Sequence, residues 1–357
     1  MNKYETIAEQ IKEQIAAAMK EGQLALPTEE ALCRQYACSR QTIRHALQLL
    51  KEQKLIASRQ GSGYVATGLL ADYEQNLVAL LFPRDDDAEH AALLHRLKGA
   101  LAKSGYQVAV FLHEGNAQKE REALLSLLRR PLRGLIVEPA LSHMPSIQAD
   151  LYERLRQQAD ALVFVKERNP NLSAYCGVFE KNAEGAYLAT RYLLDNQHKQ
   201  IAAMFQADSL CGPESFLGFS RAMLEAGLPI PQDHIGWFNG LDYLEIEREE
   251  ENDFLKRFLQ NRLSSCTAVL CQNDTLAYWL IKELQARSIS VPQTVSVVSF
   301  GNSYICRLSR PALTAFGYEE ETIVAEILNL FTRQLQKKRV RDVSLDWTLY
   351  ERESTTL

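Results

Sequence analysis

A run of arginine, glutamine and hydroxyl side chains at residues 39–44 is the part of this sequence whose spacing most clearly predicts chemistry. Arg40, Gln41 and Arg44 occupy the first two turns of a predicted helix. When the start of such a helix enters a major groove, Arg can form two hydrogen bonds with guanine, and Gln with adenine. Ser39 and Thr42 can donate to phosphate beside the backbone amides of the helix start. The run therefore predicts contacts to double-stranded DNA.

A glycine turn supplies a second candidate contact, built from Arg59, Gln60, Gly61, Ser62 and Gly63. Gly61 and Gly63 allow the backbone to approach a sugar-phosphate chain closely, with Arg59 and Gln60 beside it. Taken singly, such residues are more often a solvated helix face and a plain hairpin turn. Helix, helix and hairpin follow one another here in an order typical of DNA-binding domains, which favours the DNA interpretation.

The spacing of apolar residues predicts the helices and strands that position these side chains. Residues 3–20 predict an amphipathic helix, residues 28–37 a short one that starts at Thr28 and Glu29, and residues 40–53 a third that follows Ser39. Residues 56–59 and 64–66 predict two strands joined by the glycine turn. We therefore expect a small winged helix-turn-helix domain over residues 1–67.

The span from Leu26 to Thr67, which contains PTEE, SRQTIRHAL and RQGSG in order, resembles the DNA-binding head of the GntR family of bacterial regulators. The resemblance implies that Thr28 and Glu29 belong to the DNA-binding surface with the residues named above. One departure is Glu30, because some family members carry a basic residue there. We expect a phosphate contact from the second helix to be missing.

The rest of the chain alternates short apolar runs with helical stretches from Leu77 onward, after a linker at residues 68–76 without clear periodicity. The apolar runs are LVALLF, QVAVFL, LRGLIVE, ALVFV, QIAAMF, TAVLC and VSVVSF. Fully apolar strands separated by helices predict parallel sheets covered on both faces. The predicted fold class is α/β: residues 77–357 form two similar lobes whose ligand binds beyond the carboxyl ends of the strands.

The segment CQNDTLAYWLIKELQARSISVPQTVSVVSFGN, followed by RPALTAFGYEEE and LYERESTT, resembles the effector domain of the LacI family. That family has a two-lobed fold similar to periplasmic binding proteins. A GntR-type head on a LacI-type body is the layout of arabinose-repressor-like regulators. The resemblance implies a homodimer that binds operator DNA, and a small-molecule effector such as a sugar or a sugar acid that binds between the lobes.

The resemblance also implies ligand positions, several of which are changed in this chain. Lys166 and Lys181 replace acids, Ser215 replaces an arginine and Gly301 replaces an aspartate, whereas Asn273 is the residue expected. Such acids and the arginine would bind sugar hydroxyls through charge-assisted hydrogen bonds. A site for a neutral sugar such as arabinose is therefore in doubt.

Gained lysines and lost acids predict a positively charged cleft that, with Arg84, would hold a carboxylate or phosphate. Alternatively, the two lysines pair with Glu167 and Glu180 on the rim. Trp237 could stack on a ligand ring, although such an aromatic is more often part of a core. The acidic run at residues 85–87 is better explained as a helix cap than as a metal site.

Composition sets the limits of the assignment. The net charge is −5, divided into +2 over residues 1–67 and −7 over the rest. Local positive charge in the head is what phosphate contacts need. No signal peptide or long apolar segment is visible, so we expect a cytoplasmic protein without a membrane segment. The seven cysteines are expected to be free thiols, although a redox pair at Cys33 and Cys38 or at Cys266 and Cys271 stays open.

The predicted function is a sequence-specific, ligand-responsive transcription regulator, a repressor of carbohydrate-related genes. The alternative keeps the DNA binding but has a degenerate sensor that serves for dimerisation or for protein partners. We find no nucleophile with its base, no phosphate loop and no metal spacing, so neither catalytic nor metal-binding residues nor a cofactor are expected, and an enzyme is disfavoured.

Overall fold

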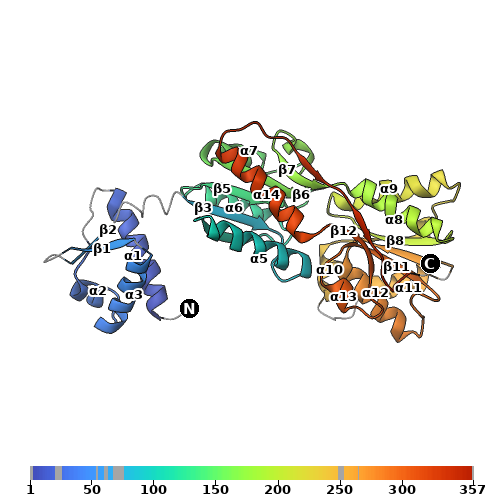
Figure 1. Ribbon diagram of the computed structural model, residues 1–357, viewed down its shortest axis with the longest axis horizontal. Helices are drawn as coiled ribbons and strands as arrows, with labels where there is room; N and C mark the ends of the chain where they lie inside the picture. The colour runs from blue at the N-terminus through green and yellow to red at the C-terminus, as the bar shows by residue number, and fades with distance from the viewer. Residues whose placement is uncertain are drawn as a thin grey trace. The chain divides into compact units, whose positions relative to one another are not determined.

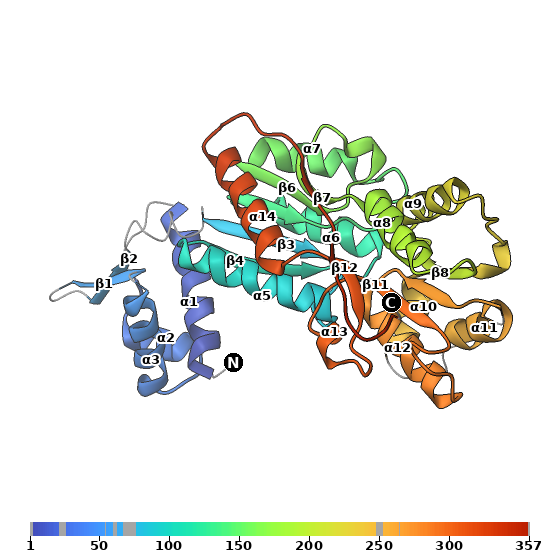
Figure 2. The same ribbon diagram turned by 45° about the vertical axis from the view of Figure 1, so that its right-hand side comes forward.

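The computed structural model describes residues 3–20, 26–53, 55–59, 63–66, 76–247, 253–263 and 265–355. Its contacts divide the chain into two units (Figures 1 and 2). The first comprises Met1–Leu77 with Gly105–Gln107, and the second comprises Val78–Ser104 with Val108–Leu357. Of the linker at residues 68–76, only Asn76 is among the described residues.

The described residues of the first unit, called the head here, form three helices and a two-stranded antiparallel sheet. The elements are α1 (Lys3–Lys20), α2 (Glu29–Gln35), α3 (Arg40–Glu52), β1 (Ile56–Arg59) and β2 (Gly63–Ala66). The second helix ends two residues before the predicted end, and Ala37 then takes a positive φ of 45°. This turn leads directly into α3, as a helix-turn-helix requires.

One apolar core holds the head together and fixes the orientation of α3. Leu32 of α2 and Ile43 and Leu47 of α3 are fully buried, packed with Ile7 and Ile11 of α1. Burial of each such side chain contributes about 1.5–3 kcal/mol relative to exposure. Because Ile43 and Leu47 lie on the inner face of α3, the side chains of Arg40, Gln41 and Arg44 are left exposed to solvent.

The second unit, called the body, consists of two lobes, each a six-stranded sheet covered on both faces. The strand order is β13-β7-β6-β5-β3-β4 in the first lobe and β14-β12-β11-β10-β8-β9 in the second. The pairs β3–β5, β5–β6, β6–β7 and β7–β13 of the first lobe and β9–β8, β8–β10, β10–β11 and β11–β12 of the second are parallel, whereas β12 and β14 pair antiparallel. The fold is thus α/β with parallel sheets, as predicted.

The first lobe contains β3 (Leu77–Phe82), α5 (Ala88–Lys103), β4 (Gln107–Leu112), α6 (Ala117–Leu127), β5 (Gly134–Val137), α7 (Ala149–Gln158), β6 (Ala161–Lys166), a 3-10 turn (Pro170–Leu172), β7 (Gly177–Glu180), α14 (Glu320–Leu335) and β13 (Val343–Leu345). The second contains α8 (Asn182–Asp195), β8 (Ile201–Gln206), α9 (Cys211–Glu225), a 3-10 turn (Gln232–His234), β9 (Ile235–Phe238), α10 (Gly240–Glu247), α11 (Asp253–Arg262), β10 (Ala268–Cys271), α12 (Asp274–Ala286), β11 (Ser296–Gly301), α13 (Ile305–Leu308), β12 (Thr314–Gly317) and β14 (Thr348–Tyr350).

The chain passes between the two lobes three times, after β7, after β12 and after β13, so that α14 returns to the first lobe (Figure 2). In the second lobe, α8 and α9 cover one face of the sheet, and α11 and α12 pack in the core on the other. Parallel strands end at the same side of their sheet, so the loops after β3, β6, β8 and β10 converge between the lobes.

Two further sequence expectations concern the thiols and membranes. Cys33, Cys38 and Cys271 carry free thiols, so neither suggested cysteine pair is a disulfide here. Within the described ranges, no helix is both long and apolar enough to span a membrane.

Candidate functional site: the DNA-facing helix and the interlobe cleft

The start of α3 is organised by side-chain caps that the sequence predicts. Ser39 is the N-cap of α3, and its Oγ accepts a hydrogen bond from the Thr42 backbone nitrogen at 3.2 Å. The Thr42 hydroxyl lies 2.8 Å from Ser39 Oγ. Thr28 caps α2 in the same manner through the Ala31 nitrogen. These caps fix the helix end that would present its amides and side chains to DNA.

Both candidate base-reading arginines are exposed and held by acids of α2. Arg44 Nε lies 3.0 Å from a Glu29 carboxylate oxygen, and Arg40 pairs with Glu30. The side chains of Arg40 and Arg44 are 60% and 66% exposed. Such exposed pairs contribute at most about 1 kcal/mol, so DNA can replace them. The two glutamates therefore form ion pairs with the arginines, a role that the sequence alone did not indicate for Glu30.

The wing is only partly visible in the described residues. β1 and β2 pair with Arg59 opposite Gly63, as a hairpin requires. Gln60, Gly61, Ser62 and the side chain of Arg59 lie outside the described part of the structure. Their predicted phosphate contacts stay predictions.

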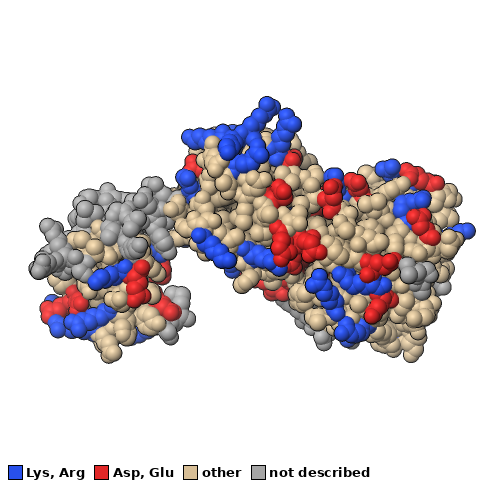
Figure 3. Space-filling model, in the orientation of Figure 1, with Lys and Arg blue, Asp and Glu red and all other residues tan. Residues whose placement is uncertain are grey.

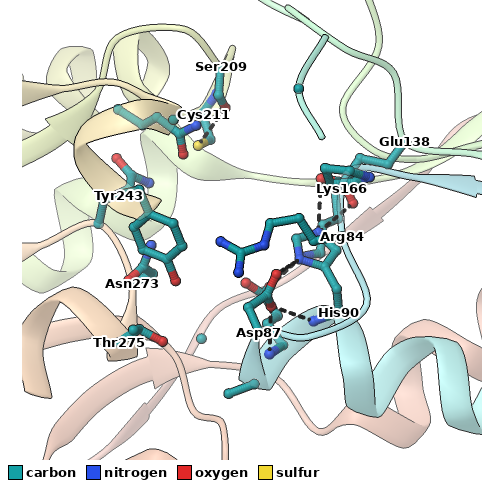
Figure 4. Close-up of a pocket in the computed structure, with 18 of the residues that line it drawn as sticks. Arg84, Asp87, His90, Glu138, Lys166, Ser209, Cys211, Tyr243, Asn273 and Thr275 are labelled. Carbon is teal, nitrogen blue, oxygen red and sulfur yellow. Dashed lines mark hydrogen bonds and ion pairs between the residues drawn. The ribbon is translucent and has the colours of Figure 1, made fainter. Parts of the chain in front are cut away.

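Between the two lobes of the body lies a cavity of about 940 Å³ (Figure 4). Four of the predicted ligand residues line it: Arg84, Lys166, Asn273 and Gly301. In Figure 4, Arg84, Asp87, His90, Glu138 and Lys166 of the first lobe face Ser209, Cys211, Tyr243, Asn273 and Thr275 of the second. The cavity lies beyond the carboxyl ends of the strands, where ligands of α/β folds bind.

Three other predicted ligand residues are placed elsewhere, which corrects the sequence-based set. Lys181 forms ion pairs with Asp346 and Glu184 and does not line the cavity. Ser215 is 1% exposed inside α9 and accepts a hydrogen bond from Gln272. The Trp237 ring packs on Phe205 and Phe216, with centroids 5.7 Å and 5.5 Å away. Trp237 does not line the cavity, and with 42% of it exposed it is not a buried core residue either.

The expectation of a positively charged cleft is wrong. Nine carboxylates line the cavity, at positions 85, 86, 87, 89, 114, 138, 167, 180 and 208. Among the described residues of the lining, the lysine and arginine side chains are Lys166 and Arg84, and Arg84 is paired with Asp86 at 2.8 Å. Loops that are distant in sequence bring their acids together in the cleft. Comparing single positions of this chain with the LacI family does not reveal this sum of charges.

A buried network connects the cations of the first lobe to these acids. His90 Nδ1 lies 2.6 Å from Asp87 and its Nε2 3.1 Å from Glu138. Burial lowers the pKa of His90, but the two carboxylates outweigh it and raise this pKa to about 10. Lys166, 8% exposed, pairs with Glu89. Burial opposes its charge too, yet Glu89, Glu138 and Glu180 keep its pKa well above the usual value.

Two acids of the network, Asp87 and Glu180, differ in their surroundings. Asp87 is the N-cap of α5 and accepts from the backbone nitrogens of Glu89 and His90, which confirms that the acidic run caps a helix. Glu180 accepts a hydrogen bond from Tyr318. Burial raises the pKa of Glu180 to about 7 against the opposing charge of Lys166. No group of metal-ligating side chains occurs among the described residues.

The lining also contains aromatic and polar residues that sequence reasoning missed. Tyr243, Tyr278, Trp279 and Trp347 contribute flat apolar surfaces. Gln272, 7% exposed, has a side-chain oxygen without a hydrogen-bond partner among the described residues. Aromatic side chains beside convergent polar groups are typical of small-ligand sites. Gln272 belongs to the CQND turn, which was a usable sequence signal. Tyr243 lies on α10, where no sequence motif indicated a ligand contact.

The glycine at position 301 has a structural explanation. Gly301 has a φ of +127°, and a Cβ there would lie 2.9 Å from Asp274 Oδ2. Asp274 in turn accepts from Ser299 Oγ and the Ser303 backbone nitrogen, each at 2.6 Å. A side chain at 301 would therefore be strained and would collide with a buried carboxylate. The aspartate expected from the LacI resemblance does not fit this backbone.

The fold and these two sites define a DNA-binding transcription regulator with a winged helix-turn-helix head and a two-lobed effector domain. Residues 3–65 match the family model described as bacterial regulatory proteins, gntR family. Residues 190–355 match the periplasmic binding protein-like domain. The chain therefore joins a head that matches the gntR family model to a body that contains a periplasmic binding protein-like domain, as the sequence predicted.

Relatives and solved structures agree with this organisation. The chain is 26% identical over 350 residues to the arabinose metabolism transcriptional repressor of Halalkalibacterium halodurans, covering 96% of this chain and 92% of that protein. A complex of the transcriptional regulator CelR with cellobiose has a similar fold, with a TM-score of 0.67 at 17% identity, covering 99% of this chain and all of that one. A regulator from Alkaliphilus metalliredigens complexed with D-xylulofuranose gives 0.66 at 19% identity, covering 79% of this chain and all of that one.

Proposed function

We propose that this protein is a repressor of sugar-metabolism genes that binds a pseudo-palindromic operator as a homodimer in the cytoplasm. The observation that carries the proposal is the outer face of α3, where Arg40, Gln41 and Arg44 are exposed at a capped helix start. A single small head makes few base contacts, and two heads on half-sites one helical turn apart multiply the affinity.

The proposed DNA surface extends beyond these three side chains. Ser39, Thr42 and the amides of the α3 start supply phosphate contacts, and Thr28 and Glu29 hold α2 and Arg44 in place. The full proposed set is Thr28, Glu29, Ser39, Arg40, Gln41, Thr42, Arg44, Arg59, Gln60, Gly61, Ser62 and Gly63. We assign residues 1–67 to the head, 68–76 to the linker and 77–357 to the effector and dimerisation domain.

We propose that the effector is a neutral, polyhydroxylated molecule such as a sugar. Carboxylates and Gln272 supply acceptors for hydroxyl donors, and Tyr243 and Trp279 supply flat apolar surfaces for a ring. Nine carboxylates would repel a sugar acid, so the anionic effector suggested by the sequence is disfavoured. Among the predicted residues, we propose Arg84, Lys166 and Asn273 as ligand contacts, because they line the cavity. A degenerate sensor is not favoured, because the cavity is lined by convergent polar and aromatic groups.

Regulation follows if closing the cleft around the effector changes the relation between the two heads of a dimer. The change in operator affinity on effector binding equals a coupling free energy between the cleft and the operator site, typically about 1–3 kcal/mol. The homologues are transcriptional regulators, and we propose that this chain likewise binds its ligand without converting it.

The experiment combines DNA selection with a ligand screen on the full chain. Duplexes with a random core are enriched by repeated binding, and neutral sugars, the matching sugar acids and sugar phosphates are then screened by thermal shift. We expect an enriched two-fold symmetric sequence, and a neutral sugar that raises the melting temperature and weakens operator binding. Failure to enrich any sequence contradicts the DNA-binding function, whereas stabilisation only by sugar acids contradicts the effector class alone.

A further inference from the structure

Basic side chains gather at the amino ends of the strands in the first lobe, opposite the cleft. The connections that enter β13 and β5 contain seven of them, and the eighth is the last residue of α5, before β4. We call this group the basic rim, and it consists of Lys103, Arg129, Arg130, Arg133, Lys337, Lys338, Arg339 and Arg341. All are exposed except Arg133, whose side chain is 37% exposed.

Few acids accompany these cations. In the described stretches that directly precede the strands of this lobe (residues 76, 104–106, 128–133, 159–160, 173–176 and 336–342), the carboxylates are Asp160 and Asp342. Each already has an arginine partner, since Asp160 pairs with Arg133 at 2.5 Å and Asp342 with Arg168 at 3.1 Å. The rim therefore keeps a large local excess of positive charge, although residues 68–357 carry a net charge of −7.

Hydrogen bonds to the lobe hold the rim in place. Gln334 near the end of α14 bonds to both the nitrogen and the oxygen of Leu162 at the start of β6. Gln158 of α7 donates to the Arg130 carbonyl, and Arg333 donates to the Arg339 carbonyl at 3.1 Å. The cations thus project from a fixed frame and form a surface of defined shape.

The two ends of this one lobe carry opposite charge. The carboxyl ends of its strands supply the acids of the cleft, whereas the amino ends supply the rim. Figure 3 shows blue side chains gathered where α14 leads into β13, at the top of the view. Folding alone does not demand such a separation, because surface cations are usually interspersed with acids. A surface of this kind fits a polyanion.

We propose that the basic rim binds the phosphate backbone of DNA that flanks the operator. The partner is indicated by connectivity, because β3 begins at Leu77 on this same side of the sheet, where the chain arriving from the head enters the lobe. DNA held by the head is therefore present near the rim at a high effective concentration. Lysine and arginine contacts to phosphate add affinity without reading sequence.

Salt dependence distinguishes these contacts from base reading. Each phosphate neutralised by a protein cation releases counterions and adds about −0.9 to the slope of log K against log salt. A contact to flanking DNA also requires that the duplex extend past the half-sites. The proposal therefore predicts a salt slope that depends on both the rim charges and the duplex length.

The test compares the full chain with the variant Lys337→Gln, Lys338→Gln, Arg339→Gln. The operator is selected from random-core duplexes with constant flanks and used with flanks of 20 base pairs or trimmed to the half-sites. On the flanked duplex we expect a slope shallower by about 1–3 units per protomer and affinity reduced about tenfold or more near 0.1 M salt. On the trimmed duplex we expect both proteins to bind alike.

The matched control removes the same charge from the second lobe through Lys199→Gln, Lys256→Gln, Arg257→Gln, and should keep the wild-type slope. Equal melting temperatures of the three proteins establish that the variants fold. An unchanged slope of the rim variant on flanked DNA overturns the proposal, and so does an equal loss in the control, which would indicate general electrostatics. Equal losses on trimmed and flanked duplexes overturn it as well, because they would place the contact inside the half-sites.

Discussion

The carboxylate of Glu167 bridges the two lobes, with Oε1 2.7 Å from the backbone nitrogen of Cys211 and 2.6 Å from Ser209 Oγ. Glu167 follows β6 in the first lobe, whereas Cys211 is the first residue of α9 in the second. The charge thus meets the positive end of a helix dipole from the opposite lobe. Ser142 of the first lobe adds to the bridge, since its Oγ accepts from the Leu210 nitrogen at 2.9 Å.

The substitution Glu167→Gln should loosen this bridge, because a neutral amide is a weaker acceptor and does not interact with the helix dipole as a charge. Hydrogen bonds to charged groups contribute about 1.5–3 kcal/mol, so we expect about 1–2 kcal/mol to be lost from the closed form. X-ray scattering of the ligand-free protein should show a larger radius of gyration. Glu225→Gln, which removes an exposed charge from the same helix, is the control. A variant as compact as the wild type would show that the bridge does not hold the lobes.

Arg40→Ala and Arg44→Ala should each weaken operator binding. Loss of a bidentate arginine–guanine contact costs about 1–3 kcal/mol, which is roughly 5- to 150-fold in the dissociation constant, and relaxes sequence preference at one base pair. Fluorescence anisotropy with the selected operator and with single-base variants of it measures both effects. Lys51→Ala, near the end of the same helix, should change little. Unchanged affinity in both arginine variants would contradict the assignment of α3.

Glu30→Gln should strengthen DNA binding. Glu30 pairs with Arg40 in the absence of DNA, and its carboxylate stands where it would repel phosphate. Removing the charge frees Arg40 and removes the repulsion, so we expect affinity to rise by about 2- to 5-fold, in line with about 0.5–1 kcal/mol for an exposed charge pair. Anisotropy titrations at several salt concentrations test this. Weaker binding would mean that the ion pair orients Arg40 for base contact.

Glu120 should make the stability of the body depend on pH. Its carboxyl is 1% exposed, and burial raises its pKa to about 7, although Tyr152 and the Ala140 nitrogen donate to it. Between about pH 4.5 and 7 the folded protein keeps a proton that the unfolded chain releases, so stability falls as pH rises through this window. The change amounts to about 3 kcal/mol at 1.4 kcal/mol per unit.

Urea unfolding at pH 5 and pH 8 measures this effect as the difference between wild type and Glu120→Gln. The glutamine keeps the acceptor oxygen but does not titrate. As pH rises, the unfolding free energy of the wild type should therefore fall relative to that of Glu120→Gln. Parallel pH profiles of the two proteins would show that the Glu120 carboxyl is already ionised when folded.

Much of this organisation follows from the sequence because it depends on local patterns. Apolar spacing predicted α1 over its full length, and the hydroxyl residues Thr28 and Ser39 marked the starts of α2 and α3. The most apolar strands, β3, β6 and β11, were predicted within a residue or two, because strands buried on both faces are almost entirely apolar. The strands β7, β9 and β12 were missed, since each is only four residues long and contains a glycine at one end or next to it.

The sequence by itself determined the class of protein, because a winged helix-turn-helix is encoded by caps, turns and apolar spacing within about 40 consecutive residues. Only the tertiary structure decided the character of the cleft. Its acids come from the start of α5, from the last residue of β7 and from the loops that follow β3, β4, β5, β6 and β8, and their charges add only where the strand ends converge. Lys166, one of the cations from which a positive site was predicted, is outnumbered there by Glu89, Glu138 and Glu180. Electrostatic potential depends on distance in space, and a sequence gives distance only along the chain.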